Sequence, residues 1–554
     1  MPPRLNAALA AFQQGKFAEA RALAVGELEQ HGGSPQLQHL LGLIECRLGR
    51  FAAGIDWLRS ASRADPGNVA FRVMLVRALV DDGRPQEALD VALRPAGASD
   101  PELALWHARA EAADAADRPD IAADSWGRLC AANPGDWRAW INLGRSFLAL
   151  DRFDEAEAAY RSALSLEWRP EAVRQLGLVY ERVNKNERLK QLLDQAEERG
   201  IERRCIADLR ATAELRDGHP ARAREWLDAG EAGDDLVRWH RLHARVADAL
   251  GDSAAAFEAT VSMNRAAPGF EDWRDQAKTY RADLLRTAQS IDRRWAECLP
   301  RLPQERCPTF LLGFPRSGTT LLDTFLMGHP DILVIEEKGL LARAVQAAGP
   351  IEQLVHVEPA QLIRIREAYL DQLDREVGNR TAHVVIDKAP LNMLLAPLIH
   401  VLFEGAPIIF AQRHPCDATL SGFMQSFAPN LAMANFLEIA DSAAFYDACM
   451  KLWSASLEAL PLRVHPVVYE ELLLDPAAVL LPVLEFVGLS WDDRVLDHRA
   501  TAASRGVLTN TSYDQITRPL TTEPLGRWQR YRAQLEPVLP LLLPWARKLG
   551  YRGE

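Results

Sequence analysis

The feature that most constrains the fold is a motif that returns every 34 residues through the first half of the chain. Its first copy, which begins at Gly15, reads GKFAEA, and further copies begin at positions 49, 83, 117 and 151. Weaker copies begin at 184, 218 and 251. A period of this length predicts a supersecondary unit that buries its apolar face only by stacking on its neighbours.

The residues of each copy predict a turn between two short helices. A Gly, Asp or Asn starts each copy and suits the end of one helix, and small Ala residues that follow let the next helix approach closely. Seven residues or so upstream, Gly42, Gly144 and Gly177 suit close contact between helices. Pro66 and Pro134 follow the second helix of their repeats and predict its end.

This pattern resembles the tetratricopeptide repeat family, with about eight repeats over residues 1–265. The resemblance implies an all-α solenoid with a concave face, which binds a protein or peptide or mediates self-association. It implies no chemistry, and a homodimer is compatible with it. Residues 266–306 are charged and are expected to form a helical connector.

Charge and apolar runs exclude several functional classes. The 554 residues include 64 basic and 76 acidic side chains, a net charge of −12, which argues against a nucleic-acid partner. No run of about 18 apolar residues occurs, so we expect no membrane span. The N-terminus shows no secretory leader, and the seven cysteines are scattered. We therefore expect a cytoplasmic protein with free thiols.

After Pro308 the pattern changes to short apolar runs that end in polar residues. These runs predict buried strands at residues 310–314, 332–335, 383–387, 407–412 and 464–468. Helical segments separate them, which favours a parallel α/β sheet. Polar residues at the carboxyl ends of parallel strands predict a ligand crevice at that edge.

The first predicted strand runs into the sequence PRSGTT, residues 315–320, and then into a helix. Strand, loop and helix N-terminus together form a typical phosphate cradle. Gly318 allows close backbone approach, Arg316 can bind anion oxygens, and Ser317, Thr319 and Thr320 add hydroxyl donors. No Lys follows Gly318, so this is not a Walker A loop, and an ATPase or a P-loop kinase is disfavoured.

Six separated motifs over about residues 308–550 make this half similar to the sulfotransferases that use 3′-phosphoadenosine 5′-phosphosulfate (PAPS), and most of all to the protein-tyrosine sulfotransferase branch. The motif residues beyond the phosphate loop are Glu336, Glu337, Lys388, Arg413, Ser421, Tyr469, Glu470, Ser512 and Arg527. The resemblance implies a P-loop-like parallel sheet flanked by helices.

The resemblance also implies catalytic roles. Glu337 is expected to be the general base, and its offset of 21 from Arg316 is the reason for preferring it to Glu336. Arg316 would stabilise the sulfuryl oxygens and the leaving phosphate. Lys388 would neutralise the leaving group, and Ser512 would donate to its bridging oxygen or 5′-phosphate.

Further residues are implied in binding. Arg413, Ser421 and Arg527 would hold the 3′-phosphate of PAPS, or of the product 3′-phosphoadenosine 5′-phosphate (PAP). Tyr469 either bonds the cofactor or fills the core. Arg343 matches a substrate-side arginine. No cluster with metal-ligand spacing occurs in the sequence, so we expect no metal.

The sequence therefore predicts a repeat solenoid joined to a PAPS-dependent sulfotransferase domain at residues 307–554. The favoured acceptor is a tyrosine hydroxyl of a protein or peptide that the repeats recruit. A glycan or small-molecule acceptor is the first alternative. A nucleotide-binding scaffold without turnover is the second, although the intact set of Arg316, Glu337, Lys388 and Ser512 argues against it.

Overall fold

A computed structural model describes residues 3–94, 103–303, 305–428, 430–504 and 520–551. The chain divides into two compact units, Met1–Ala213 and Glu214–Glu554, and each is described by itself. Ser512 lies outside the described residues.

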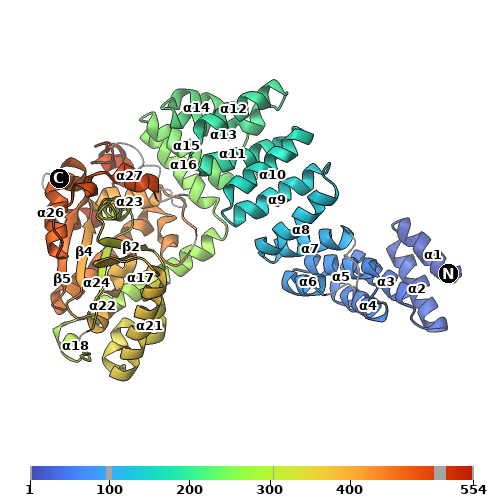
Figure 1. Ribbon diagram of the computed structural model, residues 1–554, viewed down its shortest axis with the longest axis horizontal. Helices are drawn as coiled ribbons and strands as arrows, with labels where there is room; N and C mark the ends of the chain where they lie inside the picture. The colour runs from blue at the N-terminus through green and yellow to red at the C-terminus, as the bar shows by residue number, and fades with distance from the viewer. Residues whose placement is uncertain (1–2, 95–102, 304, 429, 505–519, 552–554) are drawn as a thin grey trace. The chain divides into compact units, whose positions relative to one another are not determined.

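Helices α1 to α16 follow one another in pairs, one pair for each copy of the motif (Figure 1). Their bounds are α1 Pro3–Gln13, α2 Phe17–His31, α3 Pro35–Arg47, α4 Phe51–Ala64, α5 Val69–Asp81, α6 Pro85–Ala92, α7 Leu103–Ala115, α8 Pro119–Ala132, α9 Trp137–Ala149, α10 Phe153–Leu166, α11 Pro170–Arg182, α12 Asn186–Glu198, α13 Arg203–Arg216, α14 Pro220–Asp228, α15 Leu236–Ala249 and α16 Ser253–Arg265. The predicted helical repeat fold is confirmed.

The first residue of each motif copy has left-handed backbone geometry, as a turn that ends a helix requires. The residues with this positive φ are Gly15, Gly49, Gly83, Asp117, Asp151, Asn184, Gly218 and Gly251. Asp and Asn tolerate this region better than other residues with a side chain, which explains why only they replace Gly. The turn is therefore the conserved geometric element of the repeat within this chain.

The glycines upstream of the turns lie where helices approach closely. A Cβ atom on Gly144 would be 2.5 Å from Cε1 of Tyr160, and one on Gly177 would be 2.6 Å from Cδ1 of Leu209. Gly42 would meet Leu58 Cγ at 2.6 Å. These positions exclude a side chain because the facing residue already fills the space.

The segment after the repeats forms α17 (Phe270–Ser290) and the short α18 (Arg293–Glu297). Arg281 of α17 donates to Asn435 Oδ1 at 2.7 Å and pairs with Asp441 at 2.7 Å. Trp295 of α18 donates from its indole nitrogen to the carbonyl of Glu352 at 3.1 Å. Both helices therefore lie against the α/β part of the second unit.

A parallel sheet of five strands forms the centre of that part, in the order β2-β3-β1-β4-β5. The strands are β1 Thr309–Gly313, β2 Ile332–Glu336, β3 Val384–Lys388, β4 Pro407–Gln412 and β5 Arg463–Val468. All five lie where the apolar runs predict them. Since every strand is parallel, their carboxyl ends meet at one edge.

Helices cover both faces of the sheet (Figure 1). Their bounds are α19 Thr319–Leu326, α20 Leu340–Ala348, α21 Pro359–Val377, α22 Ala396–Leu402, α23 Pro415–Phe423, α24 Ile439–Ala459, α25 Tyr469–Leu474, α26 Pro476–Phe486, α27 His498–Ser504, α29 Arg532–Leu535 and α30 Leu539–Lys548. Phe310 and Leu312 of β1 are buried in one cluster, with α21, α22 and α24. Leu311 is buried in the other, with α19 and α26.

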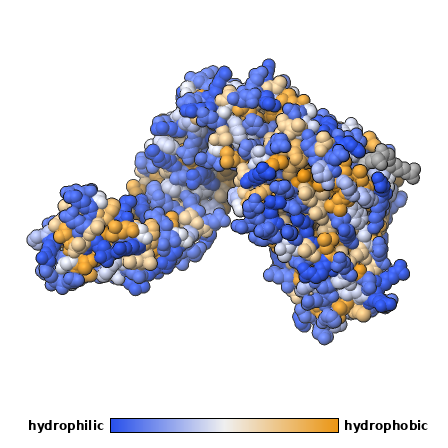
Figure 2. All heavy atoms as spheres, turned by 180° about the vertical axis from the view of Figure 1, so that it is seen from behind, coloured by the Kyte–Doolittle hydropathy of each residue, from blue (hydrophilic) through white to orange (hydrophobic). Residues whose placement is uncertain are grey.

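Among the described residues, no helix is long and apolar enough to cross a membrane. Figure 2 shows hydrophilic and hydrophobic residues interspersed over the face in view.

We expect Gly144→Ala to destabilise the repeat unit by about 1–2 kcal/mol, because overpacking against the buried Tyr160 ring outweighs the better helix propensity of Ala. Gly127→Ala is the matched control, since Gly127 lies in α8 and a Cβ there has no neighbour within 4 Å. Urea unfolding followed by circular dichroism should show the control to be as stable as the parent or slightly more. Equal effects of both substitutions would contradict the close contact.

Candidate active site at the carboxyl ends of the strands

The loop after β1 carries the predicted phosphate cradle. Arg316 has φ 69° and Gly318 has φ 87°, so the chain turns twice through the left-handed region before α19 begins at Thr319. A Cβ atom on Gly318 would clash with the Tyr469 ring, so this position requires glycine. Ser317 in the loop and Thr319 at the start of α19 are both buried. The left-handed backbone conformation of Arg316 is uncommon for a residue other than glycine, and backbone strain of this kind is typical of functional sites.

Three of the residues predicted to bind the cofactor surround Arg316. The Nε of Arg316 donates to Ser421 Oγ at 3.2 Å. Arg413, which follows β4, donates from Nη1 to the carbonyl of Arg316 at 3.0 Å, and its guanidinium lies 4.6 Å from the centre of the Tyr469 ring. The structure thus brings together side chains from the β1 loop, the end of β4, α23 and the start of α25.

This cluster is strongly positive and poorly solvated. Burial lowers the pKa of Arg316 to about 10, and the charges of Arg413 and Arg527 add to that effect while Tyr469 opposes it. The Nε of Arg413 is buried without a hydrogen-bond partner among the described residues. A buried donor of this kind and adjacent guanidinium groups suit a multiply charged anion such as a phosphate.

A backbone loop brings Arg527 to the same region. Asp417 of α23 accepts hydrogen bonds from the backbone nitrogens of Gly526 at 3.0 Å and Trp528 at 2.8 Å. The sequence motif contains Asp417, but its residue type alone does not reveal this role. Arg527 also pairs with Asp248 at 2.9 Å.

A second cluster surrounds Lys388, the last residue of β3. Its side chain is only 1% exposed, and Nζ lies 2.8 Å from Glu337 Oε1, 3.3 Å from Asp323 Oδ2 and 3.6 Å from Glu336 Oε1. Glu336 is the register partner of Lys388 on β2, and the next residue, Glu337, donates its backbone nitrogen to the Lys388 carbonyl at 2.8 Å. The sheet register therefore places both predicted base candidates beside Lys388.

The three carboxylates keep Lys388 charged. Burial by itself lowers the pKa of this lysine, but the charges of Asp323, Glu337 and Glu336 outweigh burial, and the pKa is raised. Lys388 is therefore a cation over the whole physiological range. The sequence analysis does not predict Asp323 as a site residue. Its position seven residues after Arg316, on the helix that the loop opens, was the available signal.

Geometry distinguishes the two glutamates. Glu337 has φ 49°, makes the shorter contact with Lys388, and exposes 49% of its side chain, against 31% for Glu336. Glu337 is therefore both fixed by Lys388 and open to an incoming acceptor.

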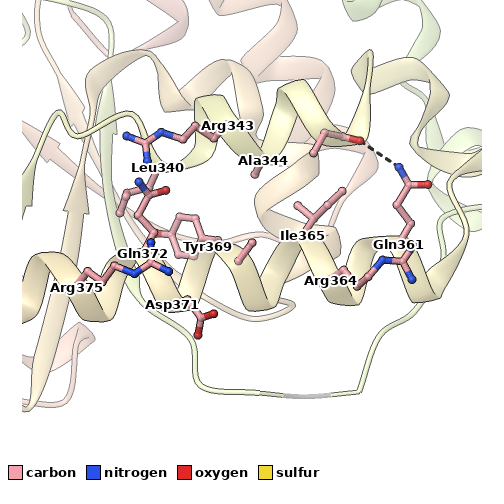
Figure 3. Close-up of a pocket in the computed structure, with 12 residues that line it drawn as sticks. Leu340, Arg343, Ala344, Gln361, Arg364, Ile365, Tyr369, Asp371, Gln372 and Arg375 are labelled. Atoms are coloured by element: carbon pink, nitrogen blue, oxygen red, sulfur yellow. Dashed lines mark hydrogen bonds between the residues drawn. The ribbon is translucent and has the colours of Figure 1, made fainter.

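Arg343 lies on α20, the helix that follows Glu337 in the chain. It lines a cavity of about 650 Å³ between α20 and α21, together with Arg364, Arg375 and Tyr369 (Figure 3). No hydrogen bond or ion pair among the described residues joins it to Lys388 or Glu337. The Tyr369 hydroxyl donates to the buried Asp387 at 2.8 Å.

The comparisons with known proteins agree with this architecture. Residues 308–493 match the sulfotransferase family, and residues 5–69, 47–101 and 107–171 match the tetratricopeptide repeat family.

Several proteins are similar to the chain. An uncharacterized protein of Aquifex aeolicus is 28% identical over 329 residues, which cover 56% of this chain and 41% of that protein. Protein-tyrosine sulfotransferase A of Caenorhabditis elegans is 26% identical, over 44% of this chain and 66% of that protein. Protein-tyrosine sulfotransferase 2 of Gallus gallus is 24% identical, over 41% of this chain and 64% of that protein. The chain thus spans about two fifths to two thirds of the length of these relatives.

Among solved structures, the sulfotransferase domain from the Synechococcus PCC 7002 olefin synthase has 21% identity and a TM-score of 0.32, over 45% of this chain and 97% of that domain.

The fold and the matches together define a two-part protein with helical repeats followed by an α/β transferase domain. The chain has tetratricopeptide repeats at its N-terminus and a sulfotransferase domain at its C-terminus, and its homologues include protein-tyrosine sulfotransferases.

The buried Asp387 predicts a pH dependence of stability. Burial raises its pKa from 3.8 to about 6, although the Tyr369 hydrogen bond opposes the shift. Between these values the unfolded chain loses the proton while the folded chain keeps it. The free energy of unfolding should therefore fall as the pH rises from about 4 to 6 and stay lower above that window.

We expect Asp387→Asn to remove this loss, so that the variant loses about 1–3 kcal/mol less stability than the parent between pH 4 and 7. Denaturant titrations at several pH values measure this difference. Asp371→Asn is the control, because Asp371 is an exposed carboxylate of the same α21 that carries Tyr369. Identical pH profiles for Asp387→Asn and the parent would refute the shifted pKa.

Proposed function

We propose that the chain transfers the sulfuryl group of PAPS to a hydroxyl acceptor, with a tyrosine of a protein or peptide as the preferred acceptor. The observation that carries the proposal is the pair of clusters at one edge of the sheet. Arg316, Arg413 and Arg527 provide positive charge for phosphates, and the Lys388–Glu337 pair provides an acid–base couple. The sequence match to the sulfotransferase family supports it.

The arginine cluster is suited to the two phosphate groups of the donor. Arg413, Ser421 and Arg527 are assigned to the 3′-phosphate. The backbone and hydroxyls of residues 317–320, at the N-terminus of α19, are assigned to the 5′-phosphosulfate. Tyr469 lies against both Gly318 and Arg413, so it shapes the space between the two phosphate sites.

Glu337 is assigned as the base that takes the acceptor proton. The acceptor oxygen forms a bond to sulfur while the bond from sulfur to the 5′-phosphate oxygen breaks, and PAP leaves. Arg316 and Lys388 offset the negative charge that gathers on the sulfuryl and leaving oxygens. Lys388 Nζ lies 2.8 Å from Glu337 Oε1, so the lysine also fixes the position of the carboxylate.

The acceptor class rests on the similarity to protein-tyrosine sulfotransferases and on the repeats. A repeat array is a typical protein-binding surface, so we assign it to recruitment of the acceptor or to self-association. The seven free cysteines support the cytoplasm, a reducing compartment, as the location.

The donor site can be tested by calorimetric titration with PAP and with AMP, which lacks only the 3′-phosphate. We expect the parent to prefer PAP, and Arg413→Ala to weaken PAP binding roughly 10- to 100-fold because a charge-assisted contact is lost. Arg380→Ala, which removes an exposed arginine after α21, is the control. A parent protein that binds the two nucleotides equally would reject PAPS as the donor.

The base can be tested by turnover with PAPS and a panel of tyrosine peptides, glycans and phenols. We expect Glu337→Gln to lower kcat by about 10²- to 10⁴-fold, because general-base catalysis contributes this much. Glu336→Gln, in the neighbouring carboxylate, should lower it by less than about tenfold. PAP affinity should stay similar in both variants.

Undiminished turnover in Glu337→Gln would reject this residue as the base. Turnover with glycans or phenols and none with peptides would replace the acceptor class and leave the donor assignment intact. PAP binding without turnover on any acceptor would favour a scaffold.

A further inference from the structure

The last repeat hairpin, α15 and α16, shares a buried core with the sulfotransferase domain. Ala247 and Ala256 belong to the same apolar cluster as Phe310 of the central strand. Asn264, only 4% exposed, donates from Nδ2 to the carbonyl of Phe423 at 3.2 Å and to that of Phe436 at 3.3 Å. Because Phe423 ends α23, the helix that carries Ser421, the hairpin is anchored beside the assigned donor site.

Asp248, at the end of α15, contacts the segment that carries Arg527. Its Oδ2 lies 2.9 Å from Nη2 of Arg527, and its Oδ1 accepts from Nε of the same arginine at 3.4 Å. The same Oδ1 accepts the Tyr531 hydroxyl at 2.6 Å and lies 3.2 Å from Arg530 Nη2. One carboxylate of the repeat segment therefore fixes three side chains of the transferase segment.

The pairing leaves part of the Arg527 guanidinium available. Asp248 engages Nε and Nη2, and the Arg527 side chain remains 23% exposed. Nη2 also lies 3.2 Å from the sulfur of Met424, three residues after Ser421. Arg527 is therefore held between the repeat hairpin and the end of α23.

The pairing of Asp248 with Arg527 is favourable at a site that contains three arginines. The guanidinium groups of Arg316, Arg413 and Arg527 repel one another, and a long side chain loses conformational entropy when it is ordered. A carboxylate that binds one guanidinium offsets both costs before the ligand arrives. Affinity for the anion then rises through preorganisation.

We propose that Asp248 is a positioning residue of the donor site, which holds Arg527 ready for the 3′-phosphate. The inference rests on the proposed function, because it takes Arg527 as a 3′-phosphate ligand. It makes the final repeat hairpin a part of the donor site as well as of the repeat array. The sulfotransferase domain would then require this hairpin to recognise its nucleotide fully.

The test is the ratio of PAP to AMP affinity in the full chain, measured by calorimetric titration. We expect Asp248→Asn to reduce this ratio about tenfold, because the charge-assisted contact to Arg527 is weakened. AMP affinity should stay unchanged, since AMP lacks the phosphate that Arg527 binds. Asp248→Glu, which keeps the charge, should restore most of the preference.

Arg530→Ala is the matched control. It removes another partner of the same carboxylate, at an arginine whose side chain is 48% exposed, and it should keep the parent ratio. A general loosening of the hairpin would lower both nucleotide affinities and the melting temperature together, without changing the ratio, and would overturn the positioning role.

An unchanged or increased ratio in Asp248→Asn would also overturn the inference, and an increase would indicate that Asp248 competes with the phosphate. These outcomes differ from failure of the proposed function, in which the parent itself shows no preference for PAP over AMP.

Discussion

The buried cation of Lys388 is the interaction on which the rest of the transferase site depends. An ammonium group that is 1% exposed is stable only with partners, and among the described residues these are Asp323, Glu336 and Glu337. Asp323 ties the lysine to the helix after the phosphate loop, and the two glutamates tie it to β2. One buried charge therefore joins three elements at the edge where the strands end.

By contrast, the neighbouring cluster of Arg316, Arg413 and Arg527 brings like charges together. Burial, together with repulsion from Arg413 and Arg527, lowers the pKa of Arg316. Such a cluster is costly in the empty site and favourable with a bound polyanion. Asp248, which comes from the repeats, pairs with Arg527 of this cluster and also with Arg530. The site thus combines a buried lysine paired with carboxylates and a cluster of arginines suited to an anion.

Sequence periodicity predicted the fold closely because its causes are local. A left-handed turn admits Gly, Asp or Asn, so the turns could be located from residue type at positions 15 to 251. The strands could be predicted equally well, since an apolar run that ends in a polar residue is typical of a buried parallel strand. Of the predicted site residues, Arg316, Ser421 and Arg413 converge, and Arg343 lines the cavity between α20 and α21.

The sequence by itself determined the repeat, the strand order along the chain and the residue types of the phosphate loop, because each depends on neighbours within a few positions. Only the tertiary structure decided which charges meet. Asp323 reaches Lys388 because β1 and β3 are adjacent in the sheet, and Asp248 reaches Arg527 across 279 positions of sequence. Such contacts follow from how elements pack, which no local pattern encodes.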